Sequence, residues 1–319
     1  YFRIKKNNLI LEIIPVLKVN NYSESQNVTD LSFFHVRYVK NKITLNKKLS
    51  DEIMLAKFFT SSQNIYGAES YINGFSGYAL ELLIIYFKSF IKFITVIASH
   101  NFKKEKLFID MEKNYKNKSE ILEKFNNSKI QGPIILIDPT NKNRNALSSL
   151  SFQSILEFQK TCKSFLKNPS LNFFKKKDVS SSFMGKRSII FNVKTIKQPG
   201  DIAGSKSKKF YQFFLGKIKK DYVIKRSEFT YNPLKNLAQF YFISGGTINF
   251  PIKGPPITLL KNVQSFKKIH KRNYINNGFI YALKNPDESF NKWYKKFLKK
   301  YKEVIKEMGI SKIELIKSD

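Results

Sequence analysis

The chain has 319 residues, of which 42% are hydrophobic and 25% are charged, and this composition excludes a largely disordered protein. The 57 Lys and Arg residues outnumber the 24 Asp and Glu residues, which gives a formal charge of +33. So large an excess favours a polyanionic partner, with nucleic acid as the first candidate and an anionic membrane surface as the second. The abundance of Lys, Asn, Ile, Phe and Tyr also fits an AT-rich genome, which would explain part of the charge.

Few residues are available for metal or disulfide chemistry. The single cysteine, Cys162, excludes a disulfide framework and a cysteine-rich zinc site. The three histidines are widely separated and form no metal-binding motif. No secretory signal is visible, so we expect a cytoplasmic protein.

The most apolar segment, residues 80–97, is a candidate membrane helix by composition alone. It carries Glu81, Lys88 and Lys92, which would lie in hydrocarbon if the segment crossed a bilayer. The sequence therefore predicts a buried amphipathic helix and no membrane contact.

The first half of the chain predicts a hairpin followed mainly by helices. Alternating strand patterns and 3.6-residue helical patterns distinguish the two. In chain order the predicted elements are two strands (1–5 and 9–14), a polar loop (18–30), a helix from residue 50 onward, a turn (74–77), an apolar helix (78–97), an apolar strand (134–137) and a helix (150–166).

The second half changes character after a Lys-, Ser- and Asn-rich stretch at 167–186, where we place a domain boundary. Strands and helices now alternate in a β-α-β-β order, which is typical of an antiparallel sheet with helices on one face. The predicted strands are 188–196, 222–230, 237–248 and 278–283, and the predicted helices are 205–220, 258–271 and 288–308. The fold class predicted for the whole chain is α+β.

Glu12 is the first candidate site residue. Alternate side chains of a strand share a face, so Glu12 lies with Ile10 and Ile14. A carboxylate on an apolar face is unfavourable unless a cation meets it, which suits a Mg²⁺ ligand. The alternative is a carboxylate at an exposed sheet edge, or one paired with a lysine.

Lys57 and Tyr66 are candidates for binding phosphate. Lys57 lies on the same helical stripe as Ile53, and Tyr66 follows nine residues later, directly before Gly67. An ammonium and a phenol near one helix end can both bind a triphosphate. The alternative is a lysine that extends from a core helix to solvent and a tyrosine packed in a loop.

His35 and Arg144 are the remaining candidates. His35 can donate a hydrogen bond to phosphate, or it can be a structural histidine. Arg144 follows Asp138 by six residues and can bind a base edge or a phosphate. The alternative for Arg144 is to cap the turn at Asp138.

Three collinear groups of motifs resemble the archaeal (class I) CCA-adding enzymes, which are tRNA nucleotidyltransferases, and together they cover essentially the whole chain. They are Ile-Tyr-Gly-Ala-Glu at 65–69 with Gly-Phe-Ser-Gly-Tyr at 74–78 and Glu-Leu-Leu-Ile at 81–84; Ile-Asp-Pro-Thr at 137–140 with Arg-Asn at 144–145 and Leu-Ser at 150–151; and Pro-Gly-Asp-Ile at 199–202 with Lys-Gly-Pro-Pro at 253–256.

This resemblance implies a nucleotidyltransferase palm in which three carboxylates hold Mg²⁺. Glu12, in Glu-Ile-Ile-Pro at 12–15, matches the third carboxylate, although the family usually has Asp there. His35, Lys57 and Tyr66 match the residues that bind the triphosphate. Arg144 matches the arginine that lies near the incoming base and the tRNA end.

The same resemblance implies a division into a palm remnant (1–40), a helical central domain (41–170), and a body and tail that bind tRNA (171–319). The family's Gly-Ser loop and first two carboxylates should precede residue 1. The resemblance therefore implies either a truncated record, which the missing initiator Met favours, or one half of a split enzyme.

The implied function is Mg²⁺-dependent addition of C, C and A to the 3′ end of tRNA from CTP and ATP, without a template. A homodimer and a separate palm subunit are the candidate assemblies. With one carboxylate of three, the chain is not expected to add nucleotides by itself. A non-catalytic RNA-binding subunit and a related A-adding polymerase are the alternative functions.

Overall fold

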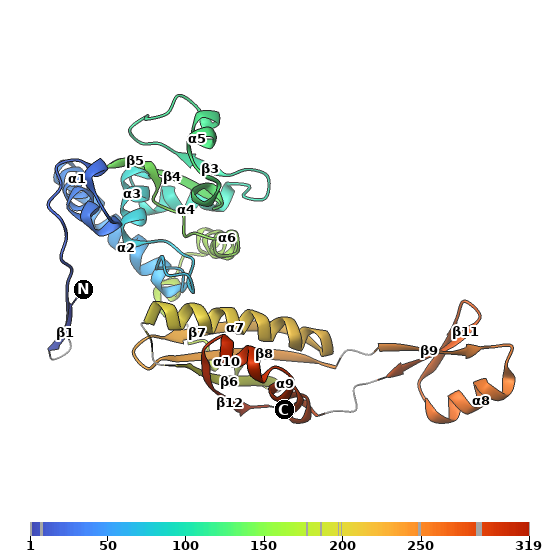
Figure 1. Ribbon diagram of the computed structural model, residues 1–319. Coiled ribbons are helices and arrows are strands. Elements are labelled where there is room, and N and C mark those ends of the chain that lie inside the picture. Colours follow the sequence, from blue (N-terminus) through green and yellow to red (C-terminus); the bar gives the residue numbers. More distant parts are fainter. Residues whose placement is uncertain are drawn as a thin grey trace. The chain divides into compact units, whose positions relative to one another are not determined.

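The computed structural model describes residues 2–6, 9–176, 178–185, 187–196, 198, 200–247, 250–284 and 289–318 (Figure 1). It divides into two compact units, residues 1–177 and 178–319. The domain boundaries expected within this division remain predictions. Some residues of the predicted elements and motifs lie outside the described residues, namely Tyr1, Asn7, Asn8, Pro199, Ile248 and Glu288.

The chain starts with the predicted hairpin, made of strands β1 (Phe2–Lys6) and β2 (Leu9–Ile13). The strands pair antiparallel, with Phe2 opposite Ile13 and Ile4 opposite Leu11, so these side chains share one face. All four are between 49% and 68% exposed. The hairpin therefore presents an apolar face that no described segment covers.

Helices α1 (Ser32–Leu45) and α2 (Lys48–Ser62) follow two 3₁₀ turns, η1 (Tyr22–Glu24) and η2 (Val28–Leu31). The sequence analysis missed α1 and started α2 two residues late. Buried Asp30 fixes the approach to α1, because its carboxylate accepts backbone hydrogen bonds from Leu17, Gln26 and Asn27.

The apolar segment forms two helices, α3 (Gly77–Phe87) and α4 (Phe90–Ser99), and not the single helix predicted. The chain breaks at Lys88, which has a left-handed φ of 66°. Both helices contribute to the main core of the first unit, as predicted for a buried segment. Among the described residues no single helix is long and apolar enough to cross a membrane; α3 and α4, bent by 94°, would reach that length only as a pair.

A small sheet completes the first unit, in the order β3-β4-β5. Strand β4 is the predicted apolar strand, and it is buried at all five positions. Helix α6 is the predicted helix, and its Phe158 joins the ring cluster around Phe59 and Phe75. The bounds are β3 (Leu107–Ile109), α5 (Lys118–Lys124), η3 (Asn127–Ile130), β4 (Ile134–Asp138), β5 (Asn141–Asn145), α6 (Phe152–Lys167) and η4 (Leu171–Phe174).

The second unit is built on an antiparallel sheet in the order β12-β6-β8-β7. Rings of α7 and α9 pack on each other, as Phe214 does on Phe297. Both helices also place a ring on Phe191 of the sheet. The bounds are η5 (Ser181–Phe183), β6 (Ser188–Thr195), α7 (Gly200–Asp221), β7 (Tyr222–Asn232), β8 (Leu237–Thr247), α9 (Phe290–Lys300), α10 (Lys302–Glu307) and β12 (Ile310–Lys317).

An excursion from this sheet forms a three-stranded sheet, β10-β11-β9, with helix α8. Its bounds are β9 (Phe250–Pro256), α8 (Leu260–Ile269), β10 (Asn273–Asn276) and β11 (Phe279–Lys284). The predicted C-terminal helix is divided at Tyr301, and β12 was not predicted. The mixture of helices with antiparallel sheets confirms the α+β class.

Candidate functional site

The Gly-Phe-Ser-Gly-Tyr motif forms the entry to α3 and determines its position. Phe75 is fully buried, and its backbone exchanges hydrogen bonds with Ile65 and Gly67, both at 2.8 Å. A Cβ atom on Gly74 would lie 1.9 Å from the Ile65 carbonyl oxygen, so only glycine permits this approach. The two segments therefore run side by side, and Tyr66 is held directly next to the start of α3.

The first turn of α3 brings Lys57 and Tyr66 together. Ser76 caps the helix by accepting a hydrogen bond from the Ala79 amide at 3.1 Å. A Cβ atom on Gly77 would lie 2.9 Å from the Tyr66 hydroxyl and 4.0 Å from the Lys57 Cε atom. An ammonium and a phenol thus converge on a helix N-terminus, which favours anions.

Lys57 already has an anionic partner on α3. Its Nζ atom lies 2.6 Å from Glu81 Oε1, and both side chains are partly exposed, at 29% and 23%. A bound phosphate group would therefore either share the Lys57 ammonium with Glu81 or displace Glu81 from it.

Tyr78, the next residue of α3, holds His35 at the helix start. The two rings stack with centroids 4.0 Å apart. His35 comes from α1, and its Nε2 atom lies 3.2 Å from Asp138 Oδ2, at the end of β4. The Arg144 Nη1 atom lies 2.6 Å from that same oxygen, so Asp138 joins two candidate residues.

The second oxygen of Asp138 is also fully engaged. Its Oδ1 atom accepts hydrogen bonds from the Tyr78 hydroxyl at 2.9 Å and from the Thr140 amide and hydroxyl, both at 2.8 Å. Burial alone would raise the pKa of Asp138, but hydrogen bonds from His35 and Thr140 outweigh it and hold that pKa well below its usual range. Burial and the Asp138 charge raise the pKa of Tyr78, so its hydroxyl stays protonated and donates.

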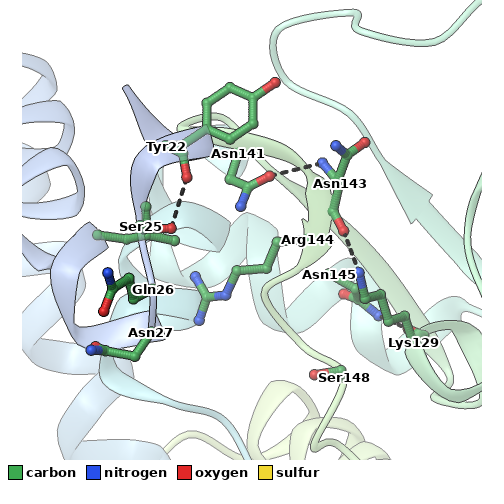
Figure 2. Close-up of a pocket in the computed structure, with 11 residues that line it drawn as sticks. Tyr22, Ser25, Gln26, Asn27, Lys129, Asn141, Asn143, Arg144, Asn145 and Ser148 are labelled. Atoms are coloured by element: carbon green, nitrogen blue, oxygen red, sulfur yellow. Dashed lines mark hydrogen bonds between the residues drawn. The ribbon is translucent and has the colours of Figure 1, made fainter. Parts of the chain in front are cut away.

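Arg144 reaches from β5 into a cavity of about 570 Å³, which Figure 2 shows. Beside it, buried Asn145 holds β5 against β4, since its side chain accepts a hydrogen bond from the Leu136 amide at 3.0 Å and donates one to the Lys129 carbonyl at 2.8 Å. The cavity is rich in side-chain amides, and its lining includes Gln26, Asn27, Asn141, Asn143 and Asn145. Such amides are suited to hydrogen-bonding the edge of a polar ring or a sugar.

Glu12 is the one predicted site residue that the structure does not bring to this place. It lies exposed on β2, opposite Arg3 in the strand pairing, and no described contact joins it to the other four. Across the part of the chain that the structure describes, no three His, Cys, Asp or Glu side chains gather as metal ligands. Glu12 offers an oxygen ligand of the kind Mg²⁺ prefers, but the described residues do not by themselves make a magnesium site.

The other four predicted residues surround the first two residues of α3, in two groups: Lys57 with Tyr66, and His35 with Arg144. The alternative role expected for Arg144 was to cap the turn at Asp138. Its contact with Asp138 is present as well. Sequence reasoning did not select Asp138, Tyr78 or Glu81 as site residues, although all three lie within the motifs that carried the resemblance.

Replacing Asp138 with Asn tests this buried cluster through its pH dependence. At pH 7 we expect a loss of about 3–5 kcal/mol in the free energy of unfolding, because the partly buried His35 and Arg144 lose the fully buried charged acceptor that they share. A carboxylate with a lowered pKa stabilises the fold fully above its ordinary value of 3.8 and less as pH falls toward the folded-state pKa. The difference from wild type should therefore be constant at pH 5–7 and shrink below about pH 4, as measured by denaturant titration.

Exposed Asp51, on α2, provides the matched control. Asp51→Asn should cost less than about 1 kcal/mol. A difference between wild type and Asp138→Asn that grows as the pH falls below 4 would contradict the assignment of Asp138 as the stabilising carboxylate.

Residues 51–175 match the family model described as tRNA nucleotidyltransferase, second domain. The chain is 32% identical over 287 residues to the CCA-adding enzyme of Nanoarchaeum equitans, which covers 89% of this chain and 69% of that protein. It is 34% identical over 174 residues to the CCA-adding enzyme of Saccharolobus shibatae, covering 54% of this chain and 38% of that protein. For the CCA-adding enzyme of Methanosarcina mazei the identity is 32% over 174 residues, with 54% and 35% covered.

The residues that match the family model include Lys57, Tyr66, the whole of α3 and Arg144. The match therefore covers most of the candidate site at the start of α3. The chain thus belongs to the archaeal-type CCA-adding enzymes, a family of tRNA nucleotidyltransferases.

Proposed function

We propose that this chain takes part in adding C, C and A to the 3′ end of tRNA by nucleotidyl transfer from CTP and ATP. The observation that carries the proposal is the convergence of Lys57, Tyr66 and His35 on the N-terminus of α3. A triphosphate placed there meets an ammonium, a phenol donor and an imidazole, together with the backbone amides of the first helical turn.

In this site the three side chains hold the triphosphate and compensate the negative charge that develops on the departing pyrophosphate. Lys57 exchanges Glu81 for phosphate oxygens when the nucleotide binds. The Tyr66 hydroxyl donates from its place next to Gly77, where the absence of a side chain leaves it room.

Arg144 and the amide-lined cavity are placed to contact the incoming base or the tRNA end. The guanidinium keeps one nitrogen on Asp138 and has further N–H donors for a ligand. The cavity lies between the 22–31 segment and β5, and its amides offer both donors and acceptors. This is the chemistry needed to select a base without a template strand.

Helix α7 of the second unit provides a cationic surface for tRNA. Its rings point into the core, where Phe210 and Phe214 are at most 1% exposed, while Lys209, Lys219 and Lys220 are exposed. Lys217 lies partly buried over the Phe213 ring, with its ammonium 5.0 Å from the ring centroid. Such a surface binds A-form RNA through backbone phosphates and shape.

The exposed apolar face of the β1–β2 hairpin supports a further element of the proposal. A two-stranded hairpin is marginal by itself, so we infer that further strands of a nucleotidyltransferase palm pack on Phe2, Ile4, Leu11 and Ile13. These strands would supply the carboxylates that a Mg²⁺ site needs besides Glu12. A separate palm subunit is the candidate source of these strands from another chain.

The proposal is tested with tRNA that lacks its 3′ CCA. A cationic surface that binds tRNA releases the counterions condensed on the RNA phosphates. We therefore expect tRNA affinity to fall about 10³-fold or more between 50 and 200 mM salt. A DNA duplex of the same length is the control for RNA shape and should bind more weakly. An affinity that is flat across this salt range, or equal for the two nucleic acids, would contradict the proposal.

A mixture of the chain and this tRNA, supplied with Mg²⁺, CTP and ATP, tests whether further carboxylates are needed for nucleotide addition. The chain alone should incorporate no nucleotide above background, as followed by labelled CTP and ATP. Incorporation by the chain alone would refute the inferred palm strands while supporting the function itself.

Gly77→Ala tests the triphosphate site. The added methyl group would lie 2.9 Å from the Tyr66 hydroxyl and displace it from the helix start. Losing one such hydrogen bond to a charged group is worth about 1.5 kcal/mol, so ATP and CTP should bind about tenfold more weakly by calorimetry.

Gly216→Ala is the matched control, because a Cβ atom at Gly216 has nothing within 4 Å. This variant should bind nucleotides as the wild type does. Equal affinities for wild type and Gly77→Ala would show that Tyr66 does not contact the triphosphate.

A further inference from the structure

Asp138 is engaged by the candidate nucleotide-binding residues but is itself inaccessible. Its side chain is fully buried at the end of β4, and all the residues of that strand are buried too. Its two oxygens accept hydrogen bonds from four different residues: Tyr78, Thr140, His35 and Arg144. A carboxylate in this position cannot touch a nucleotide, so any effect on nucleotide binding has to pass through its partners.

The two oxygens have different partners. Oδ1 meets the neutral donors of Tyr78 and Thr140, which tie α3 and the turn after β4 together. Among the described residues, Oδ2 meets the two candidate ligand-binding groups, His35 at 3.2 Å and Arg144 at 2.6 Å. The Oδ1 side is therefore suited to holding the fold, and the Oδ2 side to holding the site.

The contact with Oδ2 fixes which nitrogen of His35 is available. The Nε2 atom lies 3.2 Å from Asp138 and 3.3 Å from Arg144 Nη1. One ring nitrogen either donates or accepts, and the buried carboxylate, which can only accept, favours donation from Nε2. The ring is also stacked on Tyr78 and cannot turn freely. Nδ1 is then the nitrogen left for a ligand, and it donates to a phosphate oxygen when it also carries a proton.

We propose that Asp138 is a positioning residue for the nucleotide: through Oδ2 it aims the Nδ1 side of His35 and the guanidinium of Arg144 at the ligand. This inference rests on the proposed function. The inference goes beyond the proposed function because it assigns a role to a buried carboxylate that binds neither nucleotide nor tRNA. At metal sites, replacing a residue that orients a ligand-binding side chain typically costs 10- to 100-fold in affinity, and we expect an effect of the same size here.

Asp138→Asn separates the two sides of the carboxyl group. The amide keeps an oxygen for Tyr78 and Thr140 but turns an N–H donor toward His35 and Arg144, which are donors themselves. We expect the dissociation constants of ATP and CTP to rise 10- to 100-fold, measured below the melting temperature of the variant. Thr140→Val removes only a donor to Oδ1 and should leave nucleotide affinity within twofold of wild type.

A mutant cycle distinguishes positioning from a general loss of structure. In a His35→Ala/Arg144→Ala background, adding Asp138→Asn should change nucleotide affinity by less than threefold, because the residues that it positions are gone. A loss of the same size in both backgrounds would overturn the positioning role. A wild-type chain that binds neither ATP nor CTP would overturn the proposed function, and with it this inference.

A measurement on the wild-type chain does not depend on whether Asp138→Asn folds. The chain has three histidines, so ¹⁵N-labelled imidazole signals can be assigned by comparison with His35→Gln. Titration with ATP should move the His35 Nδ1 resonance and leave Nε2 nearly unchanged. Movement of Nε2 alone would mean that the nucleotide displaces Asp138, which contradicts the proposal.

Discussion

The candidate site at the start of α3 depends on one buried carboxylate, Asp138, at the end of a buried strand. Asp138 joins α1, α3, β4 and β5 through His35, Tyr78 and Arg144, and it does so without exposure to water. A buried charge is tolerable only when it is fully hydrogen-bonded, so these elements cannot separate without leaving it unpaired. The same requirement that holds the fold together also holds two candidate ligand-binding side chains at fixed positions.

The start of α3 is the second constraint, and it is steric. Gly74 permits the backbone contact that holds the Tyr66 loop, and Gly77 leaves room for the Tyr66 hydroxyl. Between them Phe75 anchors the loop in the core and Ser76 caps the helix. Each residue of the motif thus has a local physical role, and together they place Lys57 and Tyr66 at the positive end of a helix.

Much of this could be predicted from the sequence where a pattern is local. The hairpin and most strands of the second unit follow from alternation and turn residues, and β4 follows from its continuous apolar run. Lys57, Tyr66, His35 and Arg144 were selected through the motifs that carried the family resemblance. The role of Asp138 could not be found that way, because its partners lie up to 103 residues away in the chain. The break at Lys88 and the edge strand β12 depend on tertiary packing, which overrides local propensity.

The central claim is that the helix start and its surrounding cations form one triphosphate site. The most direct measurement is an experimental structure of the chain with CTP bound. The account predicts phosphate oxygens at the first turn of α3, in contact with Lys57 and Tyr66, with Asp138 still bound to His35 and Arg144. A triphosphate bound elsewhere, with Lys57 still paired to Glu81, would contradict it.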